Sequence, residues 1–260
     1  MCLGLVDIGS IMPGARVNGH DLYFDDHGAG DALILLHGDY ECTRYWAAQL
    51  DAFCADYRVI TYDRQGFGRS APLTALPADF YDRDAADLIA LLDHLEVAQA
   101  HLVGHSGGGT VALLAAARYP AWVHSVVAAG AHSYVEPLTI GYIREFAERL
   151  DTPPLRRAGE ACHGERWREV AQMFVDRWLD PAWRGWSILA ELSAIRCPVL
   201  LMLATDDGTA SQEQLAAMAG AIADVRTWVV PDGGHIIHRR LPERFSRQVR
   251  RFLSSIAPHP

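Results

Sequence analysis

The stretch "LVGHSGGGTVALLAAARYP", residues 102–120, places a serine and three glycines between a short apolar run and a long run rich in alanine and leucine. The first run predicts a buried strand over residues 100–106. The second predicts a helix over residues 107–119 that is apolar nearly all round and therefore buried. Glycines at such a strand-to-helix turn either cradle a phosphate or give a serine nucleophile the sharp turn it needs.

The phosphate interpretation is poorly supported. A Walker A loop needs a lysine after its glycines, and none follows here. Gly107, Gly109 and Ala112 fit a dinucleotide fingerprint formally. The acidic residue that should follow at the end of the next strand is missing, because that region reads "VVAAGAHS" (residues 126–133).

The nucleophile interpretation fits better. Gly104, Ser106 and Gly108 match the pattern G-x-S-x-G in the strand–turn–helix context that this motif requires. The turn brings the backbones on either side of the serine close together, so both neighbouring positions must be small. The helix that follows aims its N-terminal N–H groups at the site, where they stabilise an oxyanion. The sequence therefore predicts Ser106 as a nucleophile.

Short strands alternate with longer helices along the chain, which predicts an α/β fold: a mostly parallel sheet of about eight strands with helices on both faces. Strands are expected at residues 21–28, 32–38, 57–63, 100–106, 123–131, 197–204 and 225–231. Helices are expected at residues 80–95, 107–119, 212–222 and 242–256. Residues 134–191 read as helices only, so we expect a core in two parts, residues 12–133 and 192–257, interrupted by a helical lid.

A serine nucleophile needs a base, and the base needs a carboxylate that orients it. Asp206 and Asp207 directly follow the strand expected at 197–204, and His235 follows the one expected at 225–231. Ligands bind at the carboxyl ends of strands in open α/β sheets, which is the edge where Ser106 is expected. We assign Asp207 as the acid and His235 as the base, with Asp206 and His238 as the alternatives.

The site also needs donors for the oxyanion that forms during acyl transfer. The N–H of Gly107, directly after the nucleophile, is one expected donor. The loop after the strand at 32–38 reads His37-Gly38-Asp39-Tyr40, and we take the N–H of Asp39 as the second, with Tyr40 as the alternative. No metal and no organic cofactor is expected, and a zinc site at His235 and His238 is disfavoured because no H-E-x-x-H occurs.

With these residues placed, the chain from about residue 18 to residue 253 resembles the serine α/β-hydrolases. The motifs that carry this resemblance are "LLHG", "YDRQGFGRS", "LVGHSGGG", the strand-end Asp207 and "GGHIIH". The loop "DRQGFGRS" is expected to be structural. The stretches "LPADFYDRDAADLIALLDHL" and "SGGGTVALLAAARYPAWVHSVVAAGAHSYV" resemble the valacyclovir hydrolase (biphenyl hydrolase-like) branch, whose members cleave esters of small carboxylic acids, including amino-acid esters.

In that branch the residue after the nucleophile is an aspartate that holds the substrate's amino group, whereas this chain has Gly107. Asp39 and Glu41 are candidates to replace the lost charge, and the alternative is that both are solvated loop carboxylates. Further candidates for substrate contact lie around the site and in the lid: Tyr40, His105, Ile236, Trp167, Trp178, Trp183 and Trp186, with Met173 and Phe174 beside them.

The function expected from these features is a serine esterase that cleaves carboxylic esters through an acyl-enzyme. The same triad also serves lactonases, esterases of macrolactones such as macrolide antibiotics, C–C hydrolases and perhydrolases. Dehalogenase and epoxide hydrolase chemistry is disfavoured, because those branches use an aspartate where Ser106 stands. A small-ligand receptor of the same fold is the alternative outside enzymes, since a fold alone does not decide a function.

Composition narrows the partners and the compartment. The chain has 23 Lys and Arg against 32 Asp and Glu, a net charge of −9, without a basic patch, which disfavours nucleic acid and anionic membranes. We expect a small ester or lactone as partner and a monomer or small homo-oligomer. The five cysteines contain no C-x-x-C and predict reduced thiols in a cytoplasmic protein. The N-terminus lacks the features of a signal peptide, and we place the start of the folded part near Met12.

Overall fold

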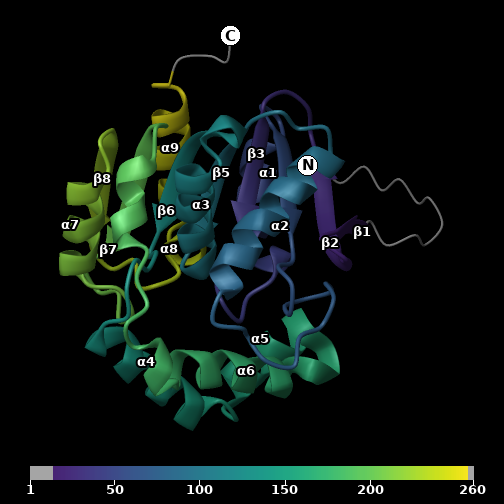
Figure 1. The fold of residues 1–260 in the computed structure, drawn as a ribbon, viewed down its shortest axis with the longest axis vertical. Coiled ribbons are helices and arrows are strands. Elements are labelled where there is room, and N and C mark those ends of the chain that lie inside the picture. The colour runs from purple at the N-terminus through teal and green to yellow at the C-terminus, as the bar shows by residue number, and fades with distance from the viewer. Residues whose placement is uncertain (1–13, 257–260) are drawn as a thin grey trace.

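The computed structural model describes residues 14–256, so the expected start near Met12 lies outside the described residues. Eight strands form one sheet in the order β1-β2-β4-β3-β5-β6-β7-β8. Figure 1 shows the sheet with its covering helices. The expected α/β fold with about eight strands is confirmed. The strands are β1 (Gly14–Val17), β2 (His20–His27), β3 (Ala32–Leu36), β4 (Arg58–Tyr62), β5 (Ala100–His105), β6 (Val123–Ala129), β7 (Val199–Ala204) and β8 (Val225–Val230).

At one edge of the sheet, β2 pairs antiparallel with both β1 and β4, and all other neighbouring strands pair parallel. Every residue of β3, β5 and β7 is buried. Parallel strands covered on both faces need apolar residues on both sides, which explains why these strands appear in the sequence as continuous apolar runs.

Alternate residues of β3 show the two layers that cover the sheet. Leu33 and Leu35 pack into a cluster with side chains of α1 (Ala47–Phe53) and α9 (Pro242–Leu253). Ile34 and Leu36 pack into a second cluster with side chains of α2 (Phe80–His94) and α3 (Gly107–Arg118). The other helices of the core are α7 (Gln212–Ala221) and α8 (Ile237–Arg240). The short elements β1, α1 and α8 were not predicted.

The helical insertion, residues 134–191, contains α4 (Pro137–Arg149), α5 (Pro153–His163) and α6 (Trp167–Leu179). These three helices lie together at the lower end of the molecule in Figure 1, below the sheet and its covering helices. Single 3₁₀ turns lie at η1 (Thr43–Trp46), η2 (Pro120–Trp122), η3 (Gly164–Arg166), η4 (Pro181–Trp183) and η5 (Leu189–Ala194). None of the helices in the described part of the chain combines the length and hydropathy that crossing a membrane requires.

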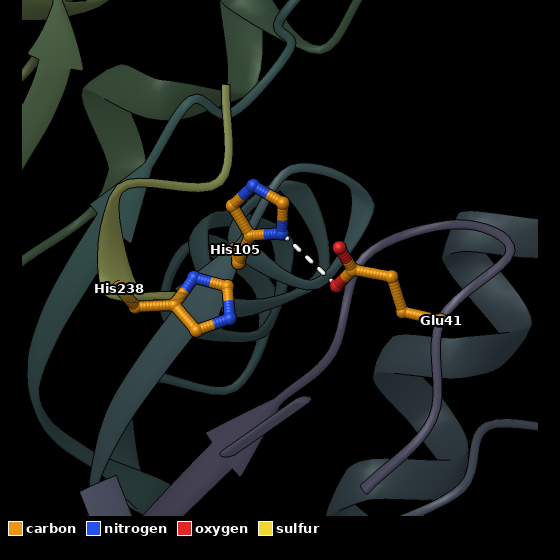
Figure 2. A group of neighbouring side chains, drawn as sticks. All are labelled: Glu41, His105 and His238. Atoms are coloured by element: carbon orange, nitrogen blue, oxygen red, sulfur yellow. Dashed lines mark hydrogen bonds and ion pairs between the residues drawn. The ribbon is translucent and has the colours of Figure 1, made fainter. Parts of the chain in front are cut away.

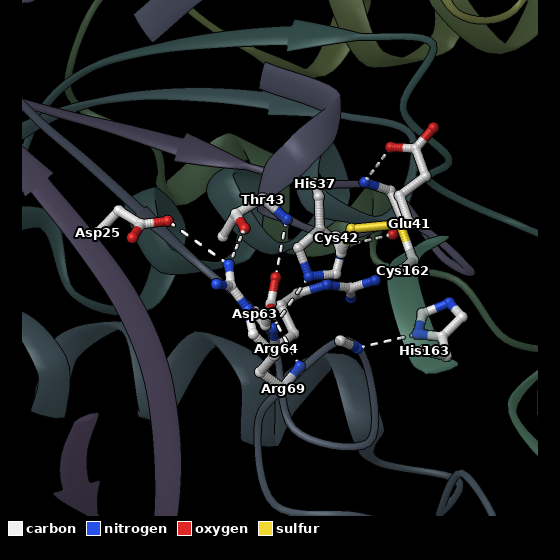
Figure 3. The surroundings of a disulfide bond; sticks show 12 residues. Asp25, His37, Glu41, Cys42, Thr43, Asp63, Arg64, Arg69, Cys162 and His163 are labelled. Carbon is white, nitrogen blue, oxygen red and sulfur yellow. Dashed lines mark hydrogen bonds and ion pairs between the residues drawn. A yellow bond between two sulfur atoms is a disulfide. The ribbon is translucent and has the colours of Figure 1, made fainter. Parts of the chain in front are cut away.

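The expectation that all cysteines are reduced thiols is wrong for two of them. Cys42 and Cys162 form a disulfide that joins the loop after β3 to the end of α5, with 5.6 Å between their Cα atoms (Figure 3). Next to it, His163 Nδ1 accepts a hydrogen bond from the Gly68 N–H at 3.0 Å. The two cysteines are 120 residues apart in the sequence, and only the folding of the insertion over this loop brings them together. The cysteine pattern therefore no longer argues for a reducing compartment.

The loop "DRQGFGRS" is held by buried polar contacts. Asp63 is fully buried, and its carboxylate accepts from the N–H of Thr43 at 2.7 Å and from the N–H of Arg69 at 2.9 Å. A Cβ on Gly68, whose φ is +53°, would lie 2.1 Å from the same carboxylate. The motif thus ties this loop to the loop after β3, in line with the structural role expected for it.

Candidate active site

Ser106 stands at the turn between β5 and α3 with φ 50° and ψ −122°, a backbone conformation that L residues rarely adopt. The turn requires its two glycine neighbours. A Cβ on Gly104 would lie 2.3 Å from the carbonyl oxygen of Gly108, and a Cβ on Gly108 would lie 2.3 Å from that of Leu36. The crowding explains the G-x-S-x-G pattern, and the tight turn places the serine at the carboxyl end of β5.

His235 and Asp207 meet at the same edge. His235 Nδ1 lies 3.0 and 3.1 Å from the two carboxylate oxygens of Asp207. Because a carboxylate oxygen accepts, Nδ1 carries the proton and Nε2 keeps its lone pair, which is the tautomer that a general base needs. The hydroxyl of Thr209, a residue that the sequence did not single out, lies 2.7 Å from Nδ1 and 2.9 Å from Asp207 Oδ1.

The interaction between His235 and Asp207 shifts both pKa values in the direction that favours a protonated histidine beside an ionised carboxylate. Burial alone lowers the pKa of His235, but the charge and hydrogen bond of Asp207 outweigh it, so that the pKa lies above the ordinary 6.5. Burial alone raises the pKa of Asp207, but the attraction of His235 and hydrogen bonds from His235 and Thr209 hold it well below its usual value. Asp207 is therefore a stable anion beside a basic histidine.

The two alternative residues are engaged elsewhere. Asp206 accepts a hydrogen bond from the Gly234 N–H at 2.8 Å instead of facing the histidine. His238 is fully buried, and its ring stacks on Trp46 with 4.1 Å between centroids. Burial lowers the pKa of His238 well below 6.5, so it is a neutral histidine in the packing of the core.

Ser106 and His235 line one cavity of about 100 Å³ beneath the helical insertion. Both residues belong to the described part of the chain, and no hydrogen bond joins the Ser106 side chain to that of His235. Catalytic hydrogen bonds are often long before substrate binds. Asp39 also lines this cavity, and Gly107 directly follows Ser106 in the chain. The N–H groups of both residues donate no hydrogen bond to another described residue.

Five of the predicted contact residues line this cavity: Tyr40, His105, Phe174, Trp178 and Ile236. Trp167, Trp183, Trp186 and Met173 do not line it. Trp183 and Trp186 stack on each other with 4.7 Å between centroids, and Trp167 lies beneath the guanidinium of Arg168. Other lining residues were not predicted: Tyr45, His132, Thr139, Tyr142, Ile143, Phe146, Leu155 and Ala158. Apolar residues of an amphipathic helix look alike in sequence whether they pack on the core or line a cavity.

Asp39 is not a solvated loop carboxylate. Its side chain is 3 % exposed and accepts three hydrogen bonds, from Arg64 Nη2, from the Tyr81 hydroxyl at 2.7 Å and from Trp178 Nε1 at 3.2 Å. It also lies directly against Gly107, where an added Cβ would stand 2.2 Å from Asp39 Oδ1. The carboxylate therefore occupies the space of any side chain at position 107.

Arg64 completes this buried network. It is fully buried between Asp39 and Asp84, whose Oδ2 lies 2.7 Å from Arg64 Nη1. Burial raises the pKa of Asp84 to about 7, although the charge of Arg64 opposes that shift. The carboxylate of Asp39 is thus neutralised by a fixed guanidinium, and its oxygens have little capacity left for a substrate cation.

Glu41 is not a solvated carboxylate either. It is 6 % exposed, and its Oε2 accepts from the Gly38 N–H at 2.7 Å and faces His105 Nδ1 at 3.0 Å. Both acidic residues of this loop are therefore buried parts of the site's framework.

Residues 33–248 match the profile described as "Alpha/beta hydrolase family". The chain is 28% identical to human serine hydrolase BPHL over 251 residues, which cover 91% of this chain and 84% of that protein. It is 31% identical to the putative carbamate hydrolase RutD of Variovorax paradoxus, over 91% of this chain and 97% of that protein. The structure of a thermophilic esterase from Thermogutta terrifontis is similar with a TM-score of 0.73 and 25% identity, over 95% of this chain and 99% of that one. The resemblance found in the sequence is confirmed.

Proposed function

Because the chain belongs to the alpha/beta hydrolase family, we propose that it is a serine hydrolase that cleaves esters of small, neutral carboxylic acids through an acyl-enzyme. The observation that carries this proposal is the pairing of His235 Nδ1 with Asp207 at the edge of the cavity that Ser106 also lines. That pairing leaves the second ring nitrogen of His235 as a base for the serine hydroxyl.

In the proposed mechanism Ser106 Oγ attacks the ester carbonyl while His235 Nε2 takes its proton. Asp207 stabilises the imidazolium, and the N–H groups of Asp39 and Gly107 stabilise the oxyanion. His235 then returns the proton to the alcohol oxygen as the C–O bond breaks. A water molecule, deprotonated by His235, attacks the acyl-enzyme and releases the acid and Ser106.

The preference for a neutral acyl group is supported by the lining of the cavity. The helical insertion contributes Ile143, Phe146, Leu155, Phe174 and Trp178. The carboxylates at the cavity wall are already paired, Asp39 with Arg64 and Glu41 with His105. An ammonium group would lose its hydration there without gaining an unpaired anion. A cavity of about 100 Å³ favours short acyl chains.

The test is turnover of p-nitrophenyl acetate and butyrate by the wild type and by Ser106→Ala. We expect rapid turnover that disappears in the variant. The substrate screen includes an amino-acid ester of equal acyl size, a lactone and an aryl carbamate. Turnover that survives in Ser106→Ala contradicts the nucleophile assignment, and a faster reaction on the amino-acid ester contradicts the neutral acyl preference.

A further inference from the structure

Besides the contact between Asp207 and His235, Glu41 and His105 form a buried carboxylate–histidine contact. Figure 2 shows Glu41 Oε2 facing His105 Nδ1, and the distance between them is 3.0 Å. The His105 side chain is fully buried and that of Glu41 is 7 % exposed. Two such groups facing each other in the interior need a defined arrangement of protons, because an unpaired buried charge is strongly destabilising.

The other contacts of the two residues define that arrangement. His105 Nε2 lies 3.0 Å from the backbone carbonyl of His235, which only accepts, so Nε2 carries a proton. Glu41 Oε2 already accepts from the Gly38 N–H. If His105 were neutral, the lone pair of Nδ1 would face a carboxylate oxygen, and two acceptors would stand 3.0 Å apart. A proton between Nδ1 and Oε2 removes that repulsion without moving any atom.

The same contacts connect three loops of the site. Gly38, held by Glu41, directly precedes Asp39, whose N–H is a proposed oxyanion donor. His105 directly precedes the nucleophile Ser106. The carbonyl that accepts from His105 belongs to the proposed base His235. The Glu41–His105 contact therefore links the backbone segments that carry the proposed oxyanion donor, the nucleophile and the base.

We propose that Glu41 and His105 share a proton and act as a positioning pair. The pair holds the His235 backbone and the loop that carries Asp39 in place for the reaction of Ser106. This inference rests on the proposed function, since it assigns the pair to the geometry of that reaction. Partners that orient a catalytic group through hydrogen bonds typically change activity by about 10–100-fold when removed.

A metal ion is the other cation that the cluster could hold. Glu41, His105 and His238 each offer a ligand atom within 4.8 Å of the others, and both ring nitrogens of His238 are buried without a hydrogen-bond partner in the described part of the chain. Tetrahedral ligands at 2.0–2.2 Å from zinc lie only about 3.4 Å apart, so a zinc ion would require the stacked His238 ring to move. The proton satisfies the existing geometry, and the metal is an outcome of the test.

The first experiment compares Glu41→Gln with Asp87→Asn. Both contacts use the same oxygen, Glu41 Oε2, so a glutamine amide can accept from the Gly38 N–H or donate to a neutral His105 Nδ1, but not both, and the negative charge that holds the shared proton is lost. Asp87 pairs with His20 at 2.8 Å and is similarly buried, at 4 % exposure, yet it lies outside the cavity. We expect Glu41→Gln to lower kcat about 10–100-fold with KM changed less than about twofold. Asp87→Asn should leave kcat unchanged. An unchanged kcat in Glu41→Gln overturns the proposal.

The second experiment observes the proton directly. The ¹⁵N NMR spectrum of histidine-labelled protein should show one buried histidine whose two ring nitrogens both stay protonated at a pH above the pKa of His235. We expect that signal to be absent from His105→Gln and to change to a singly protonated ring in Glu41→Gln. A singly protonated His105 in the wild type, or one equivalent of bound metal in the purified protein, overturns the proposal. This readout does not depend on turnover, so it separates a failure of the pair from a failure of the proposed function.

Discussion

The carboxylate of Asp39 lies against the backbone of Gly107, so that a Cβ at position 107 would stand 2.2 Å from Asp39 Oδ1. In the branch that the sequence resembles, this position carries an aspartate that binds an amino group. Here an acidic side chain reaches the same place from the opposite loop, but Arg64, Tyr81 and Trp178 already bind it. Asp39 thus occupies the space of a side chain at position 107, and its carboxylate oxygens are already engaged by other groups of the protein.

Gly107→Ala tests this close approach. The added methyl group must displace either Asp39 or the N–H of residue 107, and both lie beside the proposed oxyanion hole. We expect kcat to fall about 10²–10³-fold, as for the loss of one oxyanion donor. Gly220→Ala is the control, because no atom of the described residues lies within 4 Å of a Cβ at that helical position. Equal activity of both variants would show that the space over Gly107 is not restricted.

Asp39→Asn tests whether Asp39 recognises cations. Since the carboxylate is already neutralised by Arg64, we expect turnover of cationic and neutral esters to fall by the same factor, with their ratio unchanged. The free energy of unfolding should fall by about 3–5 kcal/mol, because one partner of a buried ion pair is lost. Ester pairs matched in acyl size give the ratio, and urea-induced unfolding gives the stability. A selective loss of the cationic ester would identify Asp39 as an ammonium site.

The pH profile of kcat/KM reports on His235. The reaction needs the neutral imidazole, so activity falls as the pH drops through the pKa of this residue, which Asp207 holds above 6.5. Asp207→Asn removes the charge that raises the pKa. We therefore expect the acid limb to move to lower pH and kcat to fall about 10⁴-fold. Asp206→Asn is the matched control and should leave the limb in place; a limb that stays in place in Asp207→Asn would reject the assignment.

The Cys42–Cys162 disulfide should contribute to stability. It closes a loop of 120 residues between the loop after β3 and the helical insertion. Reduction, or the substitution Cys162→Ser, is expected to lower the free energy of unfolding by about 3–5 kcal/mol, measured by urea denaturation. Cys197→Ser should have a much smaller effect, because this half-buried thiol lies outside the disulfide. Alkylation of both Cys42 and Cys162 in the folded, unreduced protein would show that the bond does not form.

The predictable parts of the fold and site share a local physical cause. The strands β3, β5 and β7 are buried on both faces and were found as apolar runs. Gly104 and Gly108 were found because the turn at Ser106 excludes side chains there. His235 and Asp207 were selected by a rule of topology, that sites lie at the carboxyl ends of parallel strands. Each inference needed only a few neighbouring residues.

The parts that were missed depend on segments that are distant in the sequence. Nothing in the local sequence distinguishes Thr209 from other threonines. Its contact with His235 Nδ1 forms only when β7 and β8 lie side by side. The burial of Asp39 depends on Arg64 and on Trp178, which is 139 residues further along the chain. Of the four tryptophans in the insertion, only Trp178 lines the cavity among the described residues, and nothing in the local sequence distinguishes it from the others.

The central claim, that Ser106 is a nucleophile activated by His235, is tested most directly by covalent trapping. The protein is treated with a fluorophosphonate, and the mass of the intact chain and of the peptide that contains residue 106 is measured. We predict one adduct per chain, on Ser106, with labelling absent from Ser106→Ala and strongly slowed in His235→Ala. A wild-type protein that stays unlabelled, or an adduct on another residue that persists in Ser106→Ala, would contradict the claim.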